Sequence, residues 1–141
     1  MKLLIPVDDS DAARHATELA VRLAQEVSSV EVILLNVRNP PEYYGAIAAM
    51  DYAFFDRSLR EAQQRLLAAA LEHAQRIGLT HVSIHAAQGV PAQEIVRAAT
   101  QSGVDQILMG THGRSTMGTL FMGSVAQRVV HLAPMPVTLV K

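Results

Sequence analysis

The sequence lacks several residue types, and each absence narrows what the chain can be. It contains no cysteine and no tryptophan. Disulfide bonds, thiol catalysis and thiolate metal sites are therefore excluded. Aromatic residues make up only 4% of the chain, whereas hydrophobic residues make up 50%. We therefore expect an aliphatic core, as in helices packed on a buried parallel sheet.

The sequence also has no excess of charge of one sign and no long apolar run. Twelve Lys and Arg residues are balanced by thirteen Asp and Glu residues, which gives a formal net charge of −1. This balance provides no basic surface for nucleic acid or for an anionic membrane, so we expect neither partner. No apolar run approaches membrane-spanning length, and the one before Asp8 is too short for a signal peptide. We expect a cytoplasmic protein.

Strand and helix patterns alternate along the chain, which we expect to form a single domain over residues 1–141. The predicted strands cover residues 2–7, 30–37, 81–87, 106–109 and 137–140, and the predicted helices cover 11–26, 53–77, 91–102 and the residues from 124 to about 133. The alternation predicts an α/β fold of Rossmann-like type. It has three layers, with a doubly wound, parallel, five-stranded sheet of order 3-2-1-4-5 and helices on both faces.

Several local features of these elements are also predicted. Ser10 is expected to cap the first helix, and Gly78 is expected to follow the end of the long second helix. The apolar stripe of that long helix is predicted to be Phe55, Leu59, Ala62, Leu66, Ala69, His73 and Ile77. The irregular segment 38–51 is interpreted as a loop that packs Tyr43, Tyr44 and Phe54 on the domain, or else as a lid or interface segment.

The stretch from Val104 to Val130 carries the strongest functional signal. Gly110, Gly113 and Gly123-Ser124 form a G-x2-G-x9-G-[S/T] pattern between a buried strand and a helix. Such an arrangement presents backbone N–H groups to an anion, and a switch point between the first and fourth strands places Asp8 opposite it. The stretch is therefore expected to hold the phosphates of a nucleotide. Ser124 to Gln127 also match a capping box, which would give the Ser124 hydroxyl a second role.

Other readings of the glycine-rich loop fail on specific residues. Thr119-Leu120 stand where a P-loop requires Lys-Ser/Thr, so the lysine that contacts the β- and γ-phosphates is missing. No G-x-G-x-x-G or G-x-S-x-G motif is present, and no Ser–His–Asp grouping can be assembled. The sequence therefore indicates a binding loop without catalytic machinery.

The chain resembles the universal stress protein family of the nucleotide-binding type over essentially all of its length. The resemblance rests on LLIPVDDSD, on Asn36-Val37, on GVPAQEI at residues 89–95, and on VDQILMGTHGR, GSVAQRVV and APMPVTLV in the C-terminal half. It implies ATP or another adenine nucleotide as ligand, and a homodimer joined through Val137–Val140. The last strand, an uncharged edge of the predicted sheet, agrees with that pairing.

The resemblance also implies roles for individual residues. Gly110, Gly113, Gly123 and Ser124 would bind the triphosphate and ribose. Asp8 and Val37 would line the adenosine side, with Pro6 and Val7 beside them and Met109 and Val125 flanking the motif.

Asp9 departs from the family, which usually has glycine at this point of the turn. Its carboxylate either repels phosphate or joins Asp8 in holding a Mg²⁺ ion that bridges to the phosphates. Arg114, beside the loop, is a candidate for offsetting the negative charge of Asp9. Two alternatives to a stress-response binding module stay open. One is a slow ATPase or phosphotransferase that uses the same site, and the other is an interaction protein that has lost nucleotide binding and docks a partner through the segment from Tyr43 to Phe55.

Overall fold

A computed structural model describes residues 1–27, 29–39, 49–113 and 122–141. The described elements follow in the order β1 (Lys2–Pro6), α1 (Asp11–Glu26), β2 (Glu31–Arg38), α2 (Ala49–Arg76), β3 (Val82–Gln88), α3 (Pro91–Gln101), β4 (Gln106–Gly110), α4 (Ser124–Leu132) and β5 (Val137–Val140). All four strand pairings are parallel, and the strand order is β3-β2-β1-β4-β5. The predicted fold class and strand order are therefore confirmed.

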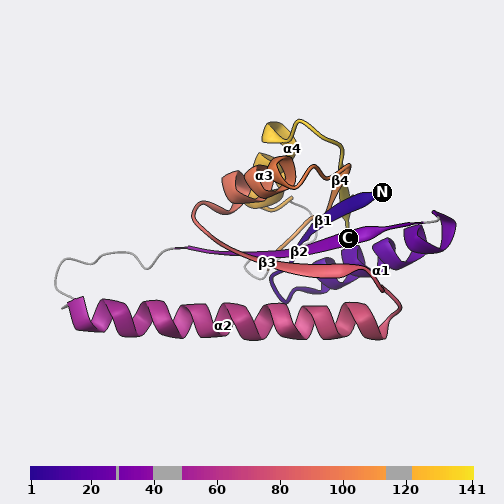
Figure 1. Cartoon of the computed structure of the whole chain (residues 1–141). Coiled ribbons are helices and arrows are strands. Elements are labelled where there is room, and N and C mark those ends of the chain that lie inside the picture. The colour runs from indigo at the N-terminus through magenta and orange to yellow at the C-terminus, as the bar shows by residue number, and fades with distance from the viewer. Residues whose placement is uncertain (28, 40–48, 114–121) are drawn as a thin grey trace.

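The sheet separates two layers of helices, as Figure 1 shows. Helices α1 and α2 cover one face, and α3 and α4 cover the other. Successive residues of a strand point to opposite faces, so Leu3 and Ile5 join the core under α1 and α2 while Leu4 joins the core under α3 and α4. Both cores are aliphatic, as the composition predicts. Among the described residues, no helix is long and apolar enough to cross a membrane.

The ends of the first two helices follow the predicted chemistry. The Ser10 hydroxyl accepts a hydrogen bond from the Ala13 N–H at 3.2 Å, which confirms it as the cap of α1. Gly78, with φ of +111°, follows the last turn of α2 in the conformation that glycine adopts most easily. Pro91 begins α3, where its missing N–H costs nothing.

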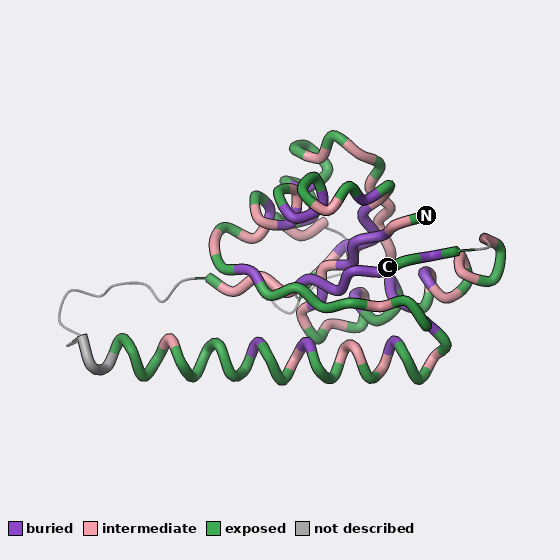
Figure 2. The backbone as a smooth tube through the Cα atoms, viewed as in Figure 1, coloured by how far each residue is buried: buried purple, intermediate pink, exposed green. Residues whose placement is uncertain are grey.

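The predicted apolar stripe of α2 is correct only in part. Leu66 packs against the core under α1 and α2, whereas Phe55 and Leu59 are exposed. The N-terminal end of α2 projects past the sheet (Figures 1 and 2). Phe54 is 68% exposed, so the expectation that it packs on the domain is wrong as well. The helix instead buries residues one position further along the chain: Gln63, Leu67 and Ala74. Tyr43 and Tyr44 lie outside the described residues.

Candidate functional site

A cavity of about 310 Å³ opens at the carboxyl ends of β1 and β4. Parallel α/β sheets bind ligands at this place, because the chain leaves neighbouring strands in opposite directions there. The site residues suggested by the sequence are brought together around it: Pro6, Val7, Asp8, Val37, Met109, Gly110, Gly113, Gly123, Ser124 and Val125. Arg114 lies outside the described residues, so its position is not described.

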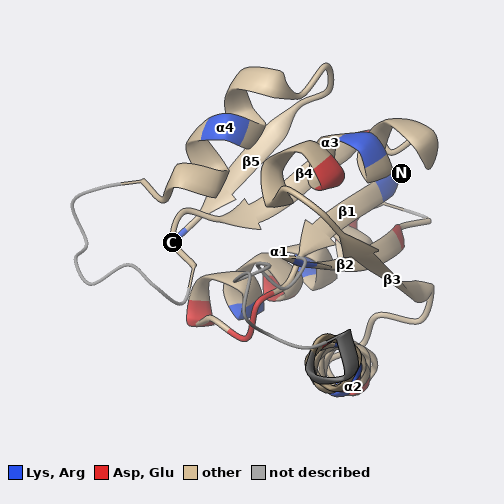
Figure 3. Cartoon of the chain, turned by 90° about the vertical axis from the view of Figure 1, so that its left-hand side faces the viewer, with Lys and Arg blue, Asp and Glu red and all other residues tan. Residues whose placement is uncertain are grey.

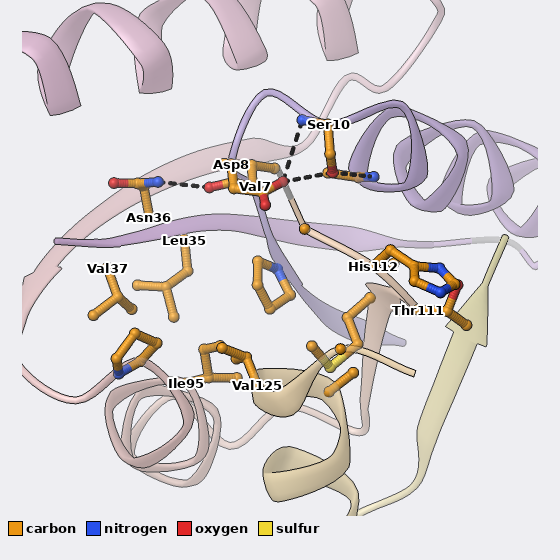
Figure 4. Close-up of a pocket in the computed structure, with 18 of the residues that line it drawn as sticks. Val7, Asp8, Ser10, Leu35, Asn36, Val37, Ile95, Thr111, His112 and Val125 are labelled. Carbon is orange, nitrogen blue, oxygen red and sulfur yellow. Dashed lines mark hydrogen bonds between the residues drawn. The ribbon is translucent and has the colours of Figure 1, made fainter. Parts of the chain in front are cut away.

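One side of the cavity is apolar. Leu35 and Val37 reach it from β2, Ile95 from α3 and Val125 from α4 (Figure 4). The sequence analysis missed Leu35 and Ile95, although both belong to apolar patterns that it assigned to the core. Nothing in the pattern separates a core residue from one that lines a cavity. The wall is suited to the faces of a flat aromatic ring.

The opposite side of the cavity is polar, and its geometry is fixed by the turn after β1. The Asp8 carboxylate accepts hydrogen bonds from the Ser10 N–H at 3.2 Å and from the Ser10 hydroxyl at 2.6 Å. The Asn36 amide donates to the Val7 carbonyl at 2.6 Å, which ties the turn to β2. Figure 4 shows these bonds above the cavity. Asp8 is thus held in place before any ligand arrives.

The N-terminus of α4 faces the same cavity. Gly123 is the N-cap residue and has no side-chain capping bond, and Ser124 is the first residue of the helix. The predicted capping box is therefore wrong, since the Gln127 amide donates to the Met122 carbonyl instead. The first N–H groups of a helix have no partner within it and carry partial positive charge. They are therefore available to an anion bound in the cavity.

Two glycines are required by close contacts in this region. A Cβ atom on Gly110 would stand 2.6 Å from the Cβ and 3.0 Å from the backbone carbon of Ala12. A Cβ atom on Gly113 would stand 2.7 Å from Oδ2 of Asp8. Both distances are shorter than real Cβ contacts, so a side chain at either position forces its neighbours to move. The glycine-rich segment therefore packs directly against α1 and against the turn that carries Asp8.

The charge at the cavity comes mostly from the backbone. Among its described lining residues there is no Lys or Arg, and Asp8 is the one carboxylate. Asp9 does not line this cavity: its backbone has φ of 65°, and its carboxylate pairs with Arg14 at 3.1 Å. The described residues contain no group of three or more His, Asp or Glu placed to hold a metal ion. A metal ion here would need oxygens from the ligand itself.

Thr111 and His112 complete the lining at the glycine-rich end, and the sequence analysis assigned them no role. The Thr111 hydroxyl and Nδ1 of His112 are 2.7 Å apart. Nε2 of His112 is buried and has no hydrogen-bond partner among the described residues. A conventional metal or catalytic spacing around His112 is absent from the sequence, so no signal pointed to it.

Helix α2 is bonded to the end of β2, the strand that contributes Leu35 and Val37 to the apolar wall. The buried Gln63 amide donates to the carbonyl oxygens of Asn36 at 2.8 Å and Ala87 at 2.9 Å, which fastens α2 to the ends of β2 and β3. About two turns earlier on α2, Asp56 forms an ion pair with Arg38 at 2.8 Å. The hydrogen bond from Arg38 lowers the pKa of Asp56 below its ordinary value. These bonds fix the end of β2 that carries Val37.

Comparisons with known proteins agree with the fold. The model of the universal stress protein family matches residues 1–141. Universal stress protein MJ0531 of Methanocaldococcus jannaschii is 34% identical over 142 residues, which cover 99% of this chain and 81% of that protein.

Solved structures show the same arrangement of elements. The structure of MJ0577, also from M. jannaschii, has a TM-score of 0.85 at 28% identity and covers 99% of this chain and 94% of its own. A universal stress protein of Archaeoglobus fulgidus in complex with dAMP has a TM-score of 0.69 at 24% identity. That alignment covers 100% of this chain and 98% of the other, and the likeness concerns the fold.

Proposed function

The chain belongs to the universal stress protein family, and on that premise we propose that it binds an adenine nucleotide, ATP with Mg²⁺, as a regulatory module of the stress response. One observation carries the proposal. A single cavity joins an apolar wall to an uncapped helix N-terminus and a tightly packed glycine-rich segment. A nucleotide has the same division, with a flat apolar base at one end and phosphates at the other.

In this proposal, the apolar side of the cavity holds the base and the side with the helix N-terminus holds the phosphates. The base lies between Leu35, Val37 and Ile95, and the relative of the same fold that holds dAMP makes adenine the expected base. The phosphates lie against Gly113 and the first N–H groups of α4, where the helix dipole favours negative charge. Met109 and Gly110, at the end of β4, form the floor between them.

Mg²⁺ would balance the remaining charge of the triphosphate. The described lining residues contain no Lys or Arg, so a divalent ion is a suitable source of positive charge beside the phosphates. Asp8 would supply a protein oxygen, and phosphate oxygens and water would supply the others, as is usual for Mg²⁺. Asp9 is not part of this proposal, because its carboxylate pairs with Arg14 outside the cavity.

The same geometry favours binding over catalysis. A hydrolytic site needs a group that activates the attacking water, and the titratable side chains among the described lining residues are Asp8 and His112. Asp8 is already committed to hydrogen bonds with Ser10. A slow ATPase or phosphotransferase is the second candidate. Purified protein that leaves labelled ATP intact over hours while binding it would exclude that candidate.

We also propose a homodimer joined through β5. This strand forms one edge of the sheet, and its residues Val137–Val140 are uncharged and half-buried. An uncharged strand edge presents unpaired N–H and C=O groups that a second strand can bond. A twofold pairing of two such edges would continue the sheet from one subunit into the next.

Isothermal titration calorimetry with ATP and Mg²⁺ tests the binding proposal. We expect one site per chain with micromolar affinity, which corresponds to about −8 kcal/mol. GTP should bind more weakly than ATP, because the apolar wall formed by Leu35, Val37 and Ile95 offers no hydrogen-bond partner to the polar groups of guanine. If millimolar ATP gives neither heat nor thermal stabilisation, the nucleotide-independent interaction module becomes the better account.

A further inference from the structure

A second cavity, of about 440 Å³, lies between α1 and α2 on the other side of the turn after β1. Figure 3 shows the two helices below the sheet, with α2 seen along its axis. The turn separates the two cavities: Asp8 lines the first, and Asp9 lines the second. We refer to the second cavity as the α1/α2 groove. Its volume is within the range of small-molecule sites in proteins.

The charged lining of the α1/α2 groove is mainly basic. Arg14, Arg65 and Arg76 line it, whereas Asp9 is the one carboxylate among its lining residues. Asp9 is not available to neutralise the other arginines, since it pairs with Arg14, which is also bonded to Asp11. The Arg14 cluster is therefore satisfied within the turn. The positive charge that is left comes from α2.

Of the three arginines that line the groove, Arg65 and Arg76 have no carboxylate partner among the described residues. Neither forms an ion pair with any residue that the structure describes, although Glu61 and Glu72 each stand one turn before an arginine on the same helix. Arg76 has one hydrogen-bond partner there, Nδ1 of His73 at 3.4 Å. The groove therefore carries two guanidinium groups without a counter-ion from the described part of the chain. An anionic ligand would supply the missing negative charge.

His73 adds an unused hydrogen-bond donor to the wall of the groove. A guanidinium group only donates, so Nδ1 of His73 accepts the bond from Arg76, and a neutral ring then carries its hydrogen on Nε2. That Nε2 is buried and has no partner among the described residues.

We propose that the α1/α2 groove binds an elongated anion that bears more than one phosphate group. Arginine matches phosphate because its planar fork donates two parallel hydrogen bonds. Arg65 and Arg76 lie about three helical turns apart, or about 16 Å along the axis at a rise of about 1.5 Å per residue. Such a separation exceeds the size of a single phosphate, whereas two flexible arginine side chains can bind the two ends of a short chain of phosphates. Between the arginines, the small and apolar residues Leu66, Ala69 and Ala70 line the groove where the middle of that chain would lie.

The test is calorimetric titration with sodium tripolyphosphate in the absence of divalent metal. The proteins compared are the wild type, the double variant Arg65→Gln/Arg76→Gln, and the control Arg57→Gln/Arg128→Gln. The control removes the same charge from two exposed arginines that line neither cavity. We expect the first double variant to bind at least about tenfold more weakly than the control, because it alone removes groove contacts.

Two results would overturn the proposal. The first is a wild type that does not bind tripolyphosphate at millimolar concentration, or a groove variant that binds as tightly as the control. The second is a Gly113→Ala variant that loses all tripolyphosphate binding, which would place the anion in the first cavity. The comparison does not depend on ATP binding, so failure of the groove and failure of the proposed nucleotide site are read separately.

Discussion

Oδ2 of Asp8 lies 2.7 Å from the position that a Cβ atom on Gly113 would occupy. These residues are far apart in the sequence, one in the turn after β1 and the other in the glycine-rich segment after β4. Their contact means that the acidic turn and the glycine-rich segment form one wall of the cavity. A change at either residue must therefore be felt at the other.

Gly113→Ala is predicted to impair nucleotide binding more than stability. The added methyl group meets Oδ2 of Asp8, the end of a side chain, so the carboxylate can turn about Oδ1, which Ser10 holds, at less cost than a shift of backbone. We expect an affinity for ATP and Mg²⁺ about tenfold weaker, or about 1.4 kcal/mol, and a free energy of unfolding within about 0.5 kcal/mol of the wild type. Calorimetry and urea denaturation measure the two effects.

Gly110→Ala provides the contrast. Its methyl group would meet the backbone of Ala12, which cannot move without shifting α1. We expect this variant to lose about 1–3 kcal/mol of stability, as overpacked cores do. Equal stability of the two alanine variants would contradict the contacts described for Gly110.

Gln63→Leu is predicted to destabilise the protein by about 1–3 kcal/mol, because it leaves the carbonyl oxygens of Asn36 and Ala87 without their side-chain donor. Gln64→Leu is the matched control, since Gln64 is exposed on the same helix. Denaturation in urea measures both. If both variants unfold at the same urea concentration, Gln63 does not fasten α2 to the sheet.

Asp9→Gly and Asp9→Ala separate backbone strain from charge. Both remove the ion pair with Arg14, which is exposed and therefore contributes little to stability. Only glycine adopts the observed φ of 65° freely, so Asp9→Ala should be less stable than Asp9→Gly by about 1 kcal/mol. Because Asp9 does not line the first cavity, Asp9→Gly should leave the affinity for ATP and Mg²⁺ unchanged. A large loss of affinity would instead indicate that Asp9 helps to hold the Mg²⁺ ion.

The Arg38–Asp56 pair predicts a dependence of stability on acid pH. The hydrogen bond from Arg38 lowers the pKa of Asp56 below the ordinary value of 3.8. As the pH falls below that value, the unfolded chain takes up the proton first, so the stabilisation is present above it and is lost as the pH falls through the folded pKa. Urea denaturation over a series of acid pH values should show a smaller decline for Arg38→Gln than for Arg57→Gln. Identical declines would count against the ion pair.

Leu139→Pro is predicted to convert the proposed dimer into monomers. The carbonyl oxygens of Pro136 and Val140 bond to Ile107 and Thr111, so the alternation along β5 directs the N–H of Leu139 away from β4. Proline removes only that outward donor, and Leu139→Ala controls for the lost side chain. Light scattering measures the mass in solution. A monomeric wild type, or a dimeric proline variant, would contradict the proposed interface.

The strands and the lining of the first cavity were predictable where a residue's position follows from its immediate neighbours. Ser10 and Pro91 act through bonds made within one helical turn, and both were placed correctly. The glycine spacing likewise located the segment that packs on Asp8, because close backbone approach requires the same residue type wherever it occurs. The alternation of elements indicated a doubly wound parallel sheet, and the common order of such sheets placed the switch point between the first and fourth strands.

Other features depend on packing between distant elements, which a single sequence does not record. Phe55 and Leu59 fit a helical stripe, yet both are exposed, because the face of α2 that meets the sheet carries Gln63, Leu67 and Ala74 instead. The role of Gln63 was not predictable for the same reason, since this polar residue is buried through hydrogen bonds to two strands that are distant in the sequence. Ser124 matched a capping box because the motif does not specify where the helix begins. Leu35 and Ile95 read as core residues because a cavity wall and a core have the same composition.

The most direct measurement is a crystal structure of the protein grown with ATP and Mg²⁺. The account predicts the adenine ring against Leu35, Val37 and Ile95, and phosphate oxygens within hydrogen-bond distance of the first N–H groups of α4. It also predicts that Asp9 stays paired with Arg14. Electron density for the nucleotide elsewhere on the molecule, or none in this cavity at millimolar ATP, would contradict the proposed function.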